Sequence, residues 1–176
     1  MPIAADHKKG KNMENAKRIL IVGDTHGRND DLKKLLKRME TPDLLIHTGD
    51  MECDPEKIEK MAGCEVAWVT GNCDFGANFV RDRELTIGKH KILLTHGHKY
   101  SVSVMYDILI EEAQKRGADI AIFGHTHKPL IRQDAGLYLI NPGSLTYPRQ
   151  DSRKPTFIMM EIDDQGEVHF ALNELE

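Results

Sequence analysis

The chain has 176 residues, 40% of them hydrophobic, and carries 24 Lys and Arg against 28 Asp and Glu, a formal net charge of −4. The length suits a single domain, and no apolar run reaches the roughly 18–20 residues of a membrane helix. Mild acidity gives the chain no electrostatic reason to bind nucleic acid non-specifically. Its nine histidines stand out, because histidine is the commonest metal ligand and acid–base residue near neutral pH.

The cysteines and the first residues indicate the organisation of the chain. Cys53, Cys64 and Cys73 are odd in number and form no CxxC pair, so we expect no disulfide framework and a cytoplasmic location. Residues 1–16 are polar and lysine-rich, without the apolar core of a signal peptide. We expect 1–16 to be a mobile tail and 17–176 to form one domain.

The first half of the chain is predicted to alternate strands with helices. Short apolar runs predict buried strands at 18–22, 43–47 and 66–69. Apolar residues at helical spacing from Leu32 to Met39 predict an amphipathic helix that follows Asp30. A second helix is expected to begin after Asp54, which suits an N-cap and precedes a proline, and to end at Gly63.

The second half is dominated by predicted hairpins. Paired strands are expected at 84–87 with 91–95, 130–132 with 137–140, and 156–162 with 168–172. A helix from 103 to 116 is expected to end at Gly117 and to precede a strand at 120–123. The elements together predict an α/β fold with a mixed sheet, or two packed sheets flanked by helices.

Polar residues follow five of the predicted strands. The segments are Asp24-Thr25-His26, Gly49-Asp50, Gly71-Asn72-Cys73-Asp74, His96-Gly97-His98 and His125-Thr126-His127. In open α/β sheets a site lies beyond the carboxyl ends of the strands, so we expect these side chains at one rim. Residues two apart in extended backbone point to the same side, which would let both members of Asp24-x-His26 and of His125-x-His127 reach a metal. The neighbouring glycines are expected to let the backbone turn sharply.

The donor types indicate which ions would bind. Oxygen and imidazole donors without a thiolate suit Mn²⁺, Fe²⁺, Zn²⁺ or Ni²⁺. Seven such donors exceed the number that one ion uses. We therefore expect two ions that share a bridging carboxylate.

The ordered blocks DTH, GD, GNCD, HGH and GHTH resemble the calcineurin-like metallophosphoesterase superfamily, and the short chain with its NPGS segment resembles the small YfcE-like branch. The resemblance spans residues 17–176 and implies a metallophosphoesterase-type β-sandwich of two mixed sheets flanked by helices, in αββα layers. It implies one metal ion on Asp24, His26 and His127, a second on Asn72, His96 and His125, and Asp50 as the bridge.

The same resemblance implies an activity and a cofactor. The expected enzyme is a phosphodiesterase that hydrolyses a phosphate ester bond by in-line attack of a metal-bridging hydroxide. Two divalent metal ions are expected, Mn²⁺ first, with Zn²⁺, Ni²⁺, Fe²⁺ or Mg²⁺ also suited to the donors. The expected partner is a small-molecule phosphoester, with neither nucleic acid nor membrane, and a homo-oligomer is left open.

Cys73 departs from the superfamily pattern. Many members have histidine there, which is taken as the acid for the leaving group, although the YfcE-like branch shares the cysteine. A thiol with an ordinary pKa near 8.5 is a poorer acid, so diesters with good aryl leaving groups are expected to react faster than alkyl ones. We hypothesise that His98, two residues beyond His96, supplies part of the missing function.

Three further residues are candidates for substrate binding. Arg28 follows DTHG and would meet a phosphate, although a solvated arginine is the alternative. Asn141 and Ser144 of the NPGS segment would line the pocket, or else form a tight turn chosen for backbone reasons. We interpret His47, which ends a predicted buried strand, as a core histidine or as one that supports a metal ligand from behind.

Other functions of the same fold stay open. A phosphomonoesterase or a nuclease is an enzymatic alternative, although the lysines at 33, 34 and 37 have the spacing of a solvated helix face. A non-catalytic scaffold that resembles the retromer subunit is the other alternative. The intact set of ligand residues favours catalysis.

Overall fold

A computed structural model describes residues 17–76 and 79–176; residues 1–16 and their predicted role lie outside this description. The described strands are β1 (Lys17–Val22), β2 (Leu44–His47), β3 (Glu65–Trp68), β4 (Asp82–Ile87), β5 (His90–Thr95), β6 (Ile120–Ile122), β7 (Pro129–Asp134), β8 (Leu137–Pro142), β9 (Thr156–Ile162) and β10 (Val168–Glu174). The described helices are α1 (Asp30–Arg38), α2 (Pro55–Ala62) and α3 (Asp107–Lys115), with a 3₁₀ turn, η1 (His98–Tyr100).

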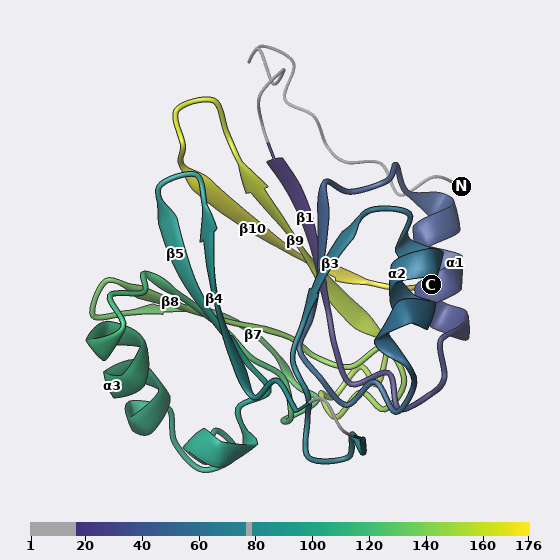
Figure 1. Ribbon diagram of the computed structural model, residues 1–176, viewed down its shortest axis with the longest axis horizontal. Coiled ribbons are helices and arrows are strands. Elements are labelled where there is room, and N and C mark those ends of the chain that lie inside the picture. The colour runs from purple at the N-terminus through teal and green to yellow at the C-terminus, as the bar shows by residue number, and fades with distance from the viewer. Residues whose placement is uncertain (1–16, 77–78) are drawn as a thin grey trace.

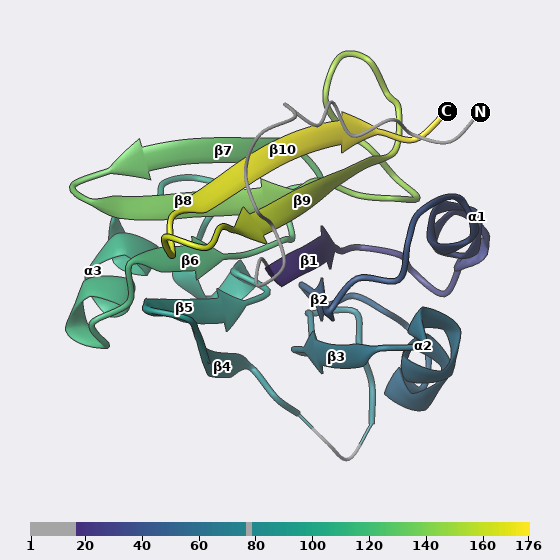
Figure 2. The same cartoon turned by 90° about the horizontal axis from the view of Figure 1, so that it is seen from above.

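The strands form two five-stranded sheets, in the orders β10-β9-β1-β2-β3 and β4-β5-β6-β8-β7. Both sheets are mixed: β1, β2 and β3 run parallel in the first and β5, β6 and β8 in the second, while β9, β10, β4 and β7 pair antiparallel with their neighbours. Figures 1 and 2 show the sheets face to face, with α1 and α2 outside the first and α3 outside the second. The predicted α/β sandwich with αββα layers is confirmed.

Three apolar layers hold the sandwich together. Alternate residues of β1 face opposite sides, so that Ile19 and Ile21 pack between the sheets while Leu20 packs against α1 and α2. A third layer, which includes Phe123 and Leu109, joins the second sheet to α3. Full burial of one such side chain contributes about 1.5–3 kcal/mol, which explains why β1 is apolar on both faces.

The predicted helix ends can be compared with the structure. The Asp54 side chain accepts a hydrogen bond from Glu56 N, and Gly63 ends α2 in a left-handed conformation with φ of 66°. The predicted start of the third helix at 103 is wrong, because α3 begins at Asp107. Ser101 is left-handed with φ of 55° and Val102 is buried, so the chain turns there before it becomes helical. Among the described residues no helix combines the length and apolarity that a membrane span needs.

Candidate metal centre

The loops that follow β1, β2 and β6 have an unusual backbone. Six non-glycine residues there have positive φ angles between 45° and 68°: Asp24, His26, Asp50, Glu52, His125 and His127. A left-handed L-residue costs roughly 1–2 kcal/mol, and such strain gathers at functional sites. The expectation that the paired ligands lie in extended backbone is wrong, because left-handed turns direct their side chains instead.

Four of the predicted ligands form one half of the site. The Asp24 Oδ1 atom lies 3.2 Å from His127 Nε2, which lies 3.2 Å from His26 Nε2. Asp50 Oδ2 lies 3.9 Å from His26 Nε2. One donor atom from each of these four residues falls within 4.8 Å of the others, which is close enough for one ion to contact them together.

The remaining predicted ligands form the other half. His96 Nε2 lies 3.1 Å from Asn72 Oδ1 and 3.3 Å from Asp50 Oδ2. The His125 ring lies beside them, with its centroid 5.2 Å from that of His96. Asp50 Oδ2 therefore faces both halves, as a bridging carboxylate would. The structure brings all seven predicted ligands together, and their role as ligands stays a proposal.

Three of the histidines are oriented by a second hydrogen bond. The Nδ1 atom of His96 donates to Thr48 O at 2.8 Å, and that of His127 donates to Tyr147 O at 2.8 Å. A carbonyl oxygen only accepts, so each of these Nδ1 atoms carries a proton. His26 Nδ1 lies 2.7 Å from a carboxylate oxygen of Glu52. The three Nε2 atoms are thereby turned toward the centre of the site, the orientation that a metal ligand needs.

The buried donors fit a cation. Asp24 is fully buried, and its Oδ1 atom has no hydrogen-bond partner among the described residues. Burial of an unpaired carboxylate oxygen is costly. The Nε2 atoms of His26 and His127 face each other at 3.2 Å, and two neutral rings protonated on Nδ1 would direct lone pairs at one another there. A divalent ion would satisfy all three atoms, and the oxygen–nitrogen donor set suits a first-row metal.

The charges around Asp50 keep the site anionic. Burial alone would raise the pKa of Asp50, but hydrogen bonds from His96 and from Cys73 N, the latter at 2.8 Å, hold it well below its usual range. Burial lowers the pKa of His47 to about 4, so this histidine is neutral. His47 is fully buried, and its Nδ1 atom accepts from Gly49 N at 3.2 Å, which agrees with its interpretation as a core residue.

At two glycines of the site there is no room for a side chain. An added Cβ at Gly71 would lie 2.0 Å from Asp50 Oδ1, and one at Gly124 would lie 2.8 Å from Asp24 Oδ2. Neither glycine has a left-handed φ, unlike Gly49 at 100°. The expectation of a sharp turn therefore holds for Gly49 alone of the three, and the other two allow ligand loops to approach closely.

Cys73 and His98 lie beside the ligands. Burial, followed by the charge of Asp50, raises the pKa of the Cys73 thiol to about 11, so the thiol keeps its proton at neutral pH. The ring centroid of His98 lies 5.4 Å from that of His96 and 6.2 Å from that of His125. Burial and the neighbouring His96 lower the pKa of His98, and its Nδ1 atom has no partner among the described residues. Their catalytic roles stay predictions.

The predicted substrate-binding residues lie in different surroundings. Arg28 is exposed, and its Cζ atom lies 5.3 Å from the ring centroid of Tyr147, which contacts the His26 ring at 5.4 Å. This places Arg28 at the rim of the site. Asn141 and Ser144 are fully buried.

The two buried residues of the NPGS segment hold the ligand loops. Asn141 Nδ2 donates to Gly124 O at 2.9 Å, and Ser144 Oγ donates to Asp24 O at 2.8 Å. These bonds join β8 and the loop after it to the ends of β1 and β6. The geometry favours the tight-turn alternative, and a direct contact with substrate stays a prediction.

The contact between Glu52 and Asp74 has little signature in the sequence. Glu52 N donates to Asp74 Oδ1 at 2.7 Å, and Gly71 N donates to Asp74 Oδ2 at 2.8 Å. Asp74 thus joins the loops that carry Asp50 and Asn72. The one available signal for Glu52 was its position two residues after Asp50, which matches the spacing from Asp24 to His26.

Comparison with known proteins now identifies the family. The model of the calcineurin-like phosphoesterase superfamily domain matches residues 18–165. The chain belongs to this superfamily. A probable metallophosphoesterase of Bacillus subtilis (strain 168), YsnB, is 36% identical over 162 residues, which cover 90% of this chain and 94% of the relative.

Solved structures with the same fold agree with this family assignment. A predicted phosphoesterase of Streptococcus pneumoniae TIGR4 superposes with a TM-score of 0.75 at 26% identity, over 90% of this chain and 98% of that one. Wild-type Vps29 of Entamoeba histolytica complexed with Zn²⁺ superposes with a TM-score of 0.69 at 25% identity, over 90% of this chain and 99% of that one. Superfamily members use divalent metals, and the described residues contain a cluster suited to one.

Proposed function

We propose that this superfamily member is a dinuclear metal-dependent phosphodiesterase that acts on a small-molecule phosphoester. The observation that carries the proposal is the position of Asp50 Oδ2, 3.9 Å from His26 Nε2 in one half of the site and 3.3 Å from His96 Nε2 in the other. The Asp24 Oδ1 atom, which has no hydrogen-bond partner among the described residues, adds a buried acceptor in the first half.

The residues of each half have distinct tasks. Asp24, His26 and His127 would hold the first ion, and Asn72, His96 and His125 the second, with Asp50 shared between them. When bound, two divalent ions supply a nucleophilic hydroxide at neutral pH and neutralise phosphate oxygens. Mn²⁺ is the proposed ion, and the Vps29 complex supports Zn²⁺ as another. Arg28 at the rim would meet the phosphate.

The leaving group must gain a proton, and two groups lie close enough to take part. The Cys73 thiol, with a pKa of about 11, is a weak acid. His98 lies beside His96 and His125 with a free ring nitrogen, so we propose that His98 carries a proton toward the leaving oxygen. Diesters with good leaving groups need this proton least.

The test is hydrolysis of bis(4-nitrophenyl) phosphate with added Mn²⁺, with and without a chelator. We expect a metal-dependent rate that falls at least about 100-fold in His127→Ala, as loss of a ligand would cause. His169→Ala is the matched control, because His169 is a histidine on β10 whose side chain is 62% exposed. Metal binding without metal-dependent turnover would refute catalysis and favour a binding module. Faster hydrolysis of the corresponding monoester, 4-nitrophenyl phosphate, than of the diester would favour a phosphomonoesterase.

A further inference from the structure

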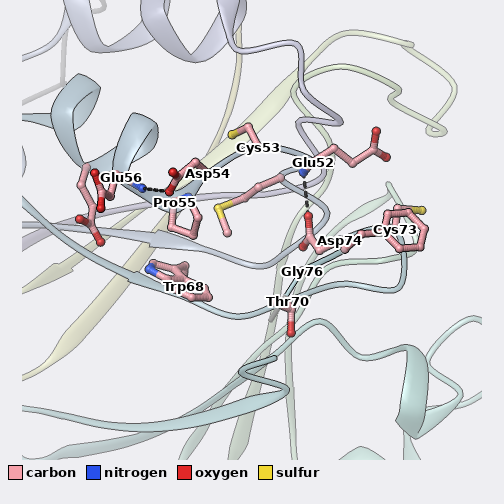
Figure 3. Close-up of a pocket in the computed structure, with 13 residues that line it drawn as sticks. Glu52, Cys53, Asp54, Pro55, Glu56, Trp68, Thr70, Cys73, Asp74 and Gly76 are labelled. Atoms are coloured by element: carbon pink, nitrogen blue, oxygen red, sulfur yellow. Dashed lines mark hydrogen bonds between the residues drawn. The ribbon is translucent and has the colours of Figure 1, made fainter. Parts of the chain in front are cut away.

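A cavity adjoins the candidate metal centre. Its volume is about 840 Å³, within the roughly 300–1,000 Å³ of small-molecule sites. It lies between the start of α2 and the loop that follows β3 (Figure 3). Glu52 and Cys73 line it, and Glu52 also bonds to His26. Glu52 therefore connects the lining of the cavity to the metal centre.

The lining of the cavity is acidic. Five carboxylates line it and none of its described lining residues is Lys, Arg or His. Three of the five are engaged within the fold: Glu52 with His26, Asp54 as the cap of α2, and Asp74 with two backbone amides. Glu56 and Glu59, three residues apart on one face of α2, are the carboxylates placed to meet a ligand.

Glu56 is neutralised only weakly. Glu56 lies 3.4 Å from Lys60 in an ion pair whose side chains are 69% and 79% exposed. Exposed pairs of this kind contribute little and exchange readily. The cavity therefore presents negative charge to any molecule that enters it.

Aromatic side chains complete the wall. Trp68 at the end of β3 and Phe75 in the following loop both line the cavity, and Phe75 is 94% exposed. Aromatic rings attract cations, quaternary ammonium groups above all. Arg83 Cζ lies 5.6 Å from the Trp68 ring centroid, so this ring already contacts one guanidinium of the fold. Carboxylates and aromatic rings in one cavity are complementary to an alkylammonium group.

We propose that this cavity binds a cationic alkylammonium group, so that the enzyme selects small phosphodiesters in which an ammonium is joined to the phosphate by a short linker. The proposal rests on the proposed function: the phosphate lies at the metal centre and the ammonium lies against Glu56, Glu59 and Trp68. The same carboxylates repel a second phosphate, which disfavours nucleotide polyphosphates and nucleic acids.

A matched pair of substrates isolates the charge. 4-Nitrophenyl phosphocholine and 4-nitrophenyl 3,3-dimethylbutyl phosphate share a leaving group and a shape but differ by one positive charge. We expect kcat/KM about tenfold higher for the choline ester. Glu56→Gln/Glu59→Gln should reduce this ratio to about twofold or less, and kcat/KM for the 3,3-dimethylbutyl ester, whose alkyl group carries no positive charge, should not fall. Glu65→Gln/Glu111→Gln, which removes two exposed carboxylates that do not line the cavity, should keep the wild-type ratio.

A second measurement needs no turnover. Trp68 is the single tryptophan of the chain, so its fluorescence reports directly on the cavity. We expect a saturable change with choline, none with 3,3-dimethylbutanol, and none with either in Glu56→Gln/Glu59→Gln. The cavity proposal would be overturned by metal-dependent hydrolysis in which the two esters have nearly equal kcat/KM and choline causes no fluorescence change. The phosphodiesterase proposal would then stand. Saturable fluorescence without hydrolysis of either ester would refute the phosphodiesterase and leave cation binding standing.

Discussion

Glu52 provides a direct test of how the candidate site holds a metal. Its Oε1 atom lies 2.7 Å from His26 Nδ1, while His26 Nε2 points toward His127 and Asp50. The carboxylate thus fixes the ring orientation and increases the electron density on Nε2. We predict that Glu52→Ala weakens metal binding without removing any ligand.

The size of the effect follows from the exposure of the pair. Loss of a carboxylate behind a ligating histidine typically weakens metal binding 10- to 100-fold. The Glu52 side chain is 39% exposed and that of His26 is 13% exposed. Water therefore replaces part of the lost Glu52–His26 hydrogen bond, and we expect a loss of affinity at the lower end of this range. We expect about tenfold weaker binding, which is about 1.4 kcal/mol, for Glu52→Ala. Glu52→Gln keeps an acceptor but loses the charge and should weaken binding about threefold.

Calorimetric titration of the metal-free protein with Mn²⁺ measures this directly. Glu111→Ala is the control, because Glu111 lies exposed on α3, away from the site. The order wild type, Glu52→Gln, Glu52→Ala in decreasing affinity supports the reasoning. Equal Mn²⁺ affinity of the wild type and both Glu52 variants would refute this reasoning, because the Glu52–His26 contact would then contribute nothing to the metal site.

Two other side chains give predictions. His98→Ala should lower kcat about tenfold or more for alkyl diesters and little for 4-nitrophenyl diesters; equal kcat values for wild type and variant with both would exclude His98 as the proton carrier. Asp82→Ala should lower the free energy of unfolding by about 1–3 kcal/mol, because Asp82 accepts hydrogen bonds from Lys99 and Tyr100 at 2.5 and 2.9 Å. Burial alone would raise the pKa of Asp82, but these bonds lower it. The stabilisation is therefore complete above the ordinary Asp pKa of about 4 and is lost as pH falls through the lowered one. Urea unfolding between pH 7 and 3 should show the wild-type advantage shrinking toward acid, and a constant difference would contradict the assignment.

Sequence patterns predicted the layers because burial and capping are local. Residues 19–22 of the predicted strand are apolar at every position, as a segment buried on both faces must be, and α2 has its cap and terminating glycine in the sequence itself. The start of α3 was missed because Ser101 and Val102 are placed by packing and a left-handed turn, neither of which leaves a periodic signal.

The site was predicted in composition but not in geometry. Residue types and their positions after strands indicated the metal centre, whereas the direction of each side chain depends on left-handed backbone at residues such as Asp24 and His127. Contacts between loops were also invisible in the sequence. Glu52 meets His26 across 26 residues of chain, and Ser144 meets Asp24 across 120. The first pair is fixed when β1 and β2 pair within one sheet, and the second only when the two sheets come together.

The loops that carry Gly71 and Asp50 must approach each other closely, and a substitution at Gly71 tests whether the site depends on this approach. A Cβ at Gly71 would lie 2.0 Å from Asp50 Oδ1 and 2.5 Å from Asp50 N. The second contact is with backbone, so rotation of the Asp50 side chain gives no relief and the loop itself must move. We predict that Gly71→Ala weakens Mn²⁺ binding about 10- to 100-fold, as displacement of a ligand or its support does. Gly117→Ala is the control: a Cβ there meets nothing within 4 Å, but φ is 69°, so it should cost about 1 kcal/mol of stability and leave metal affinity unchanged. Wild-type affinity in Gly71→Ala would show that the position of Asp50 does not depend on this contact, and the bridging role assigned to it would then need another support.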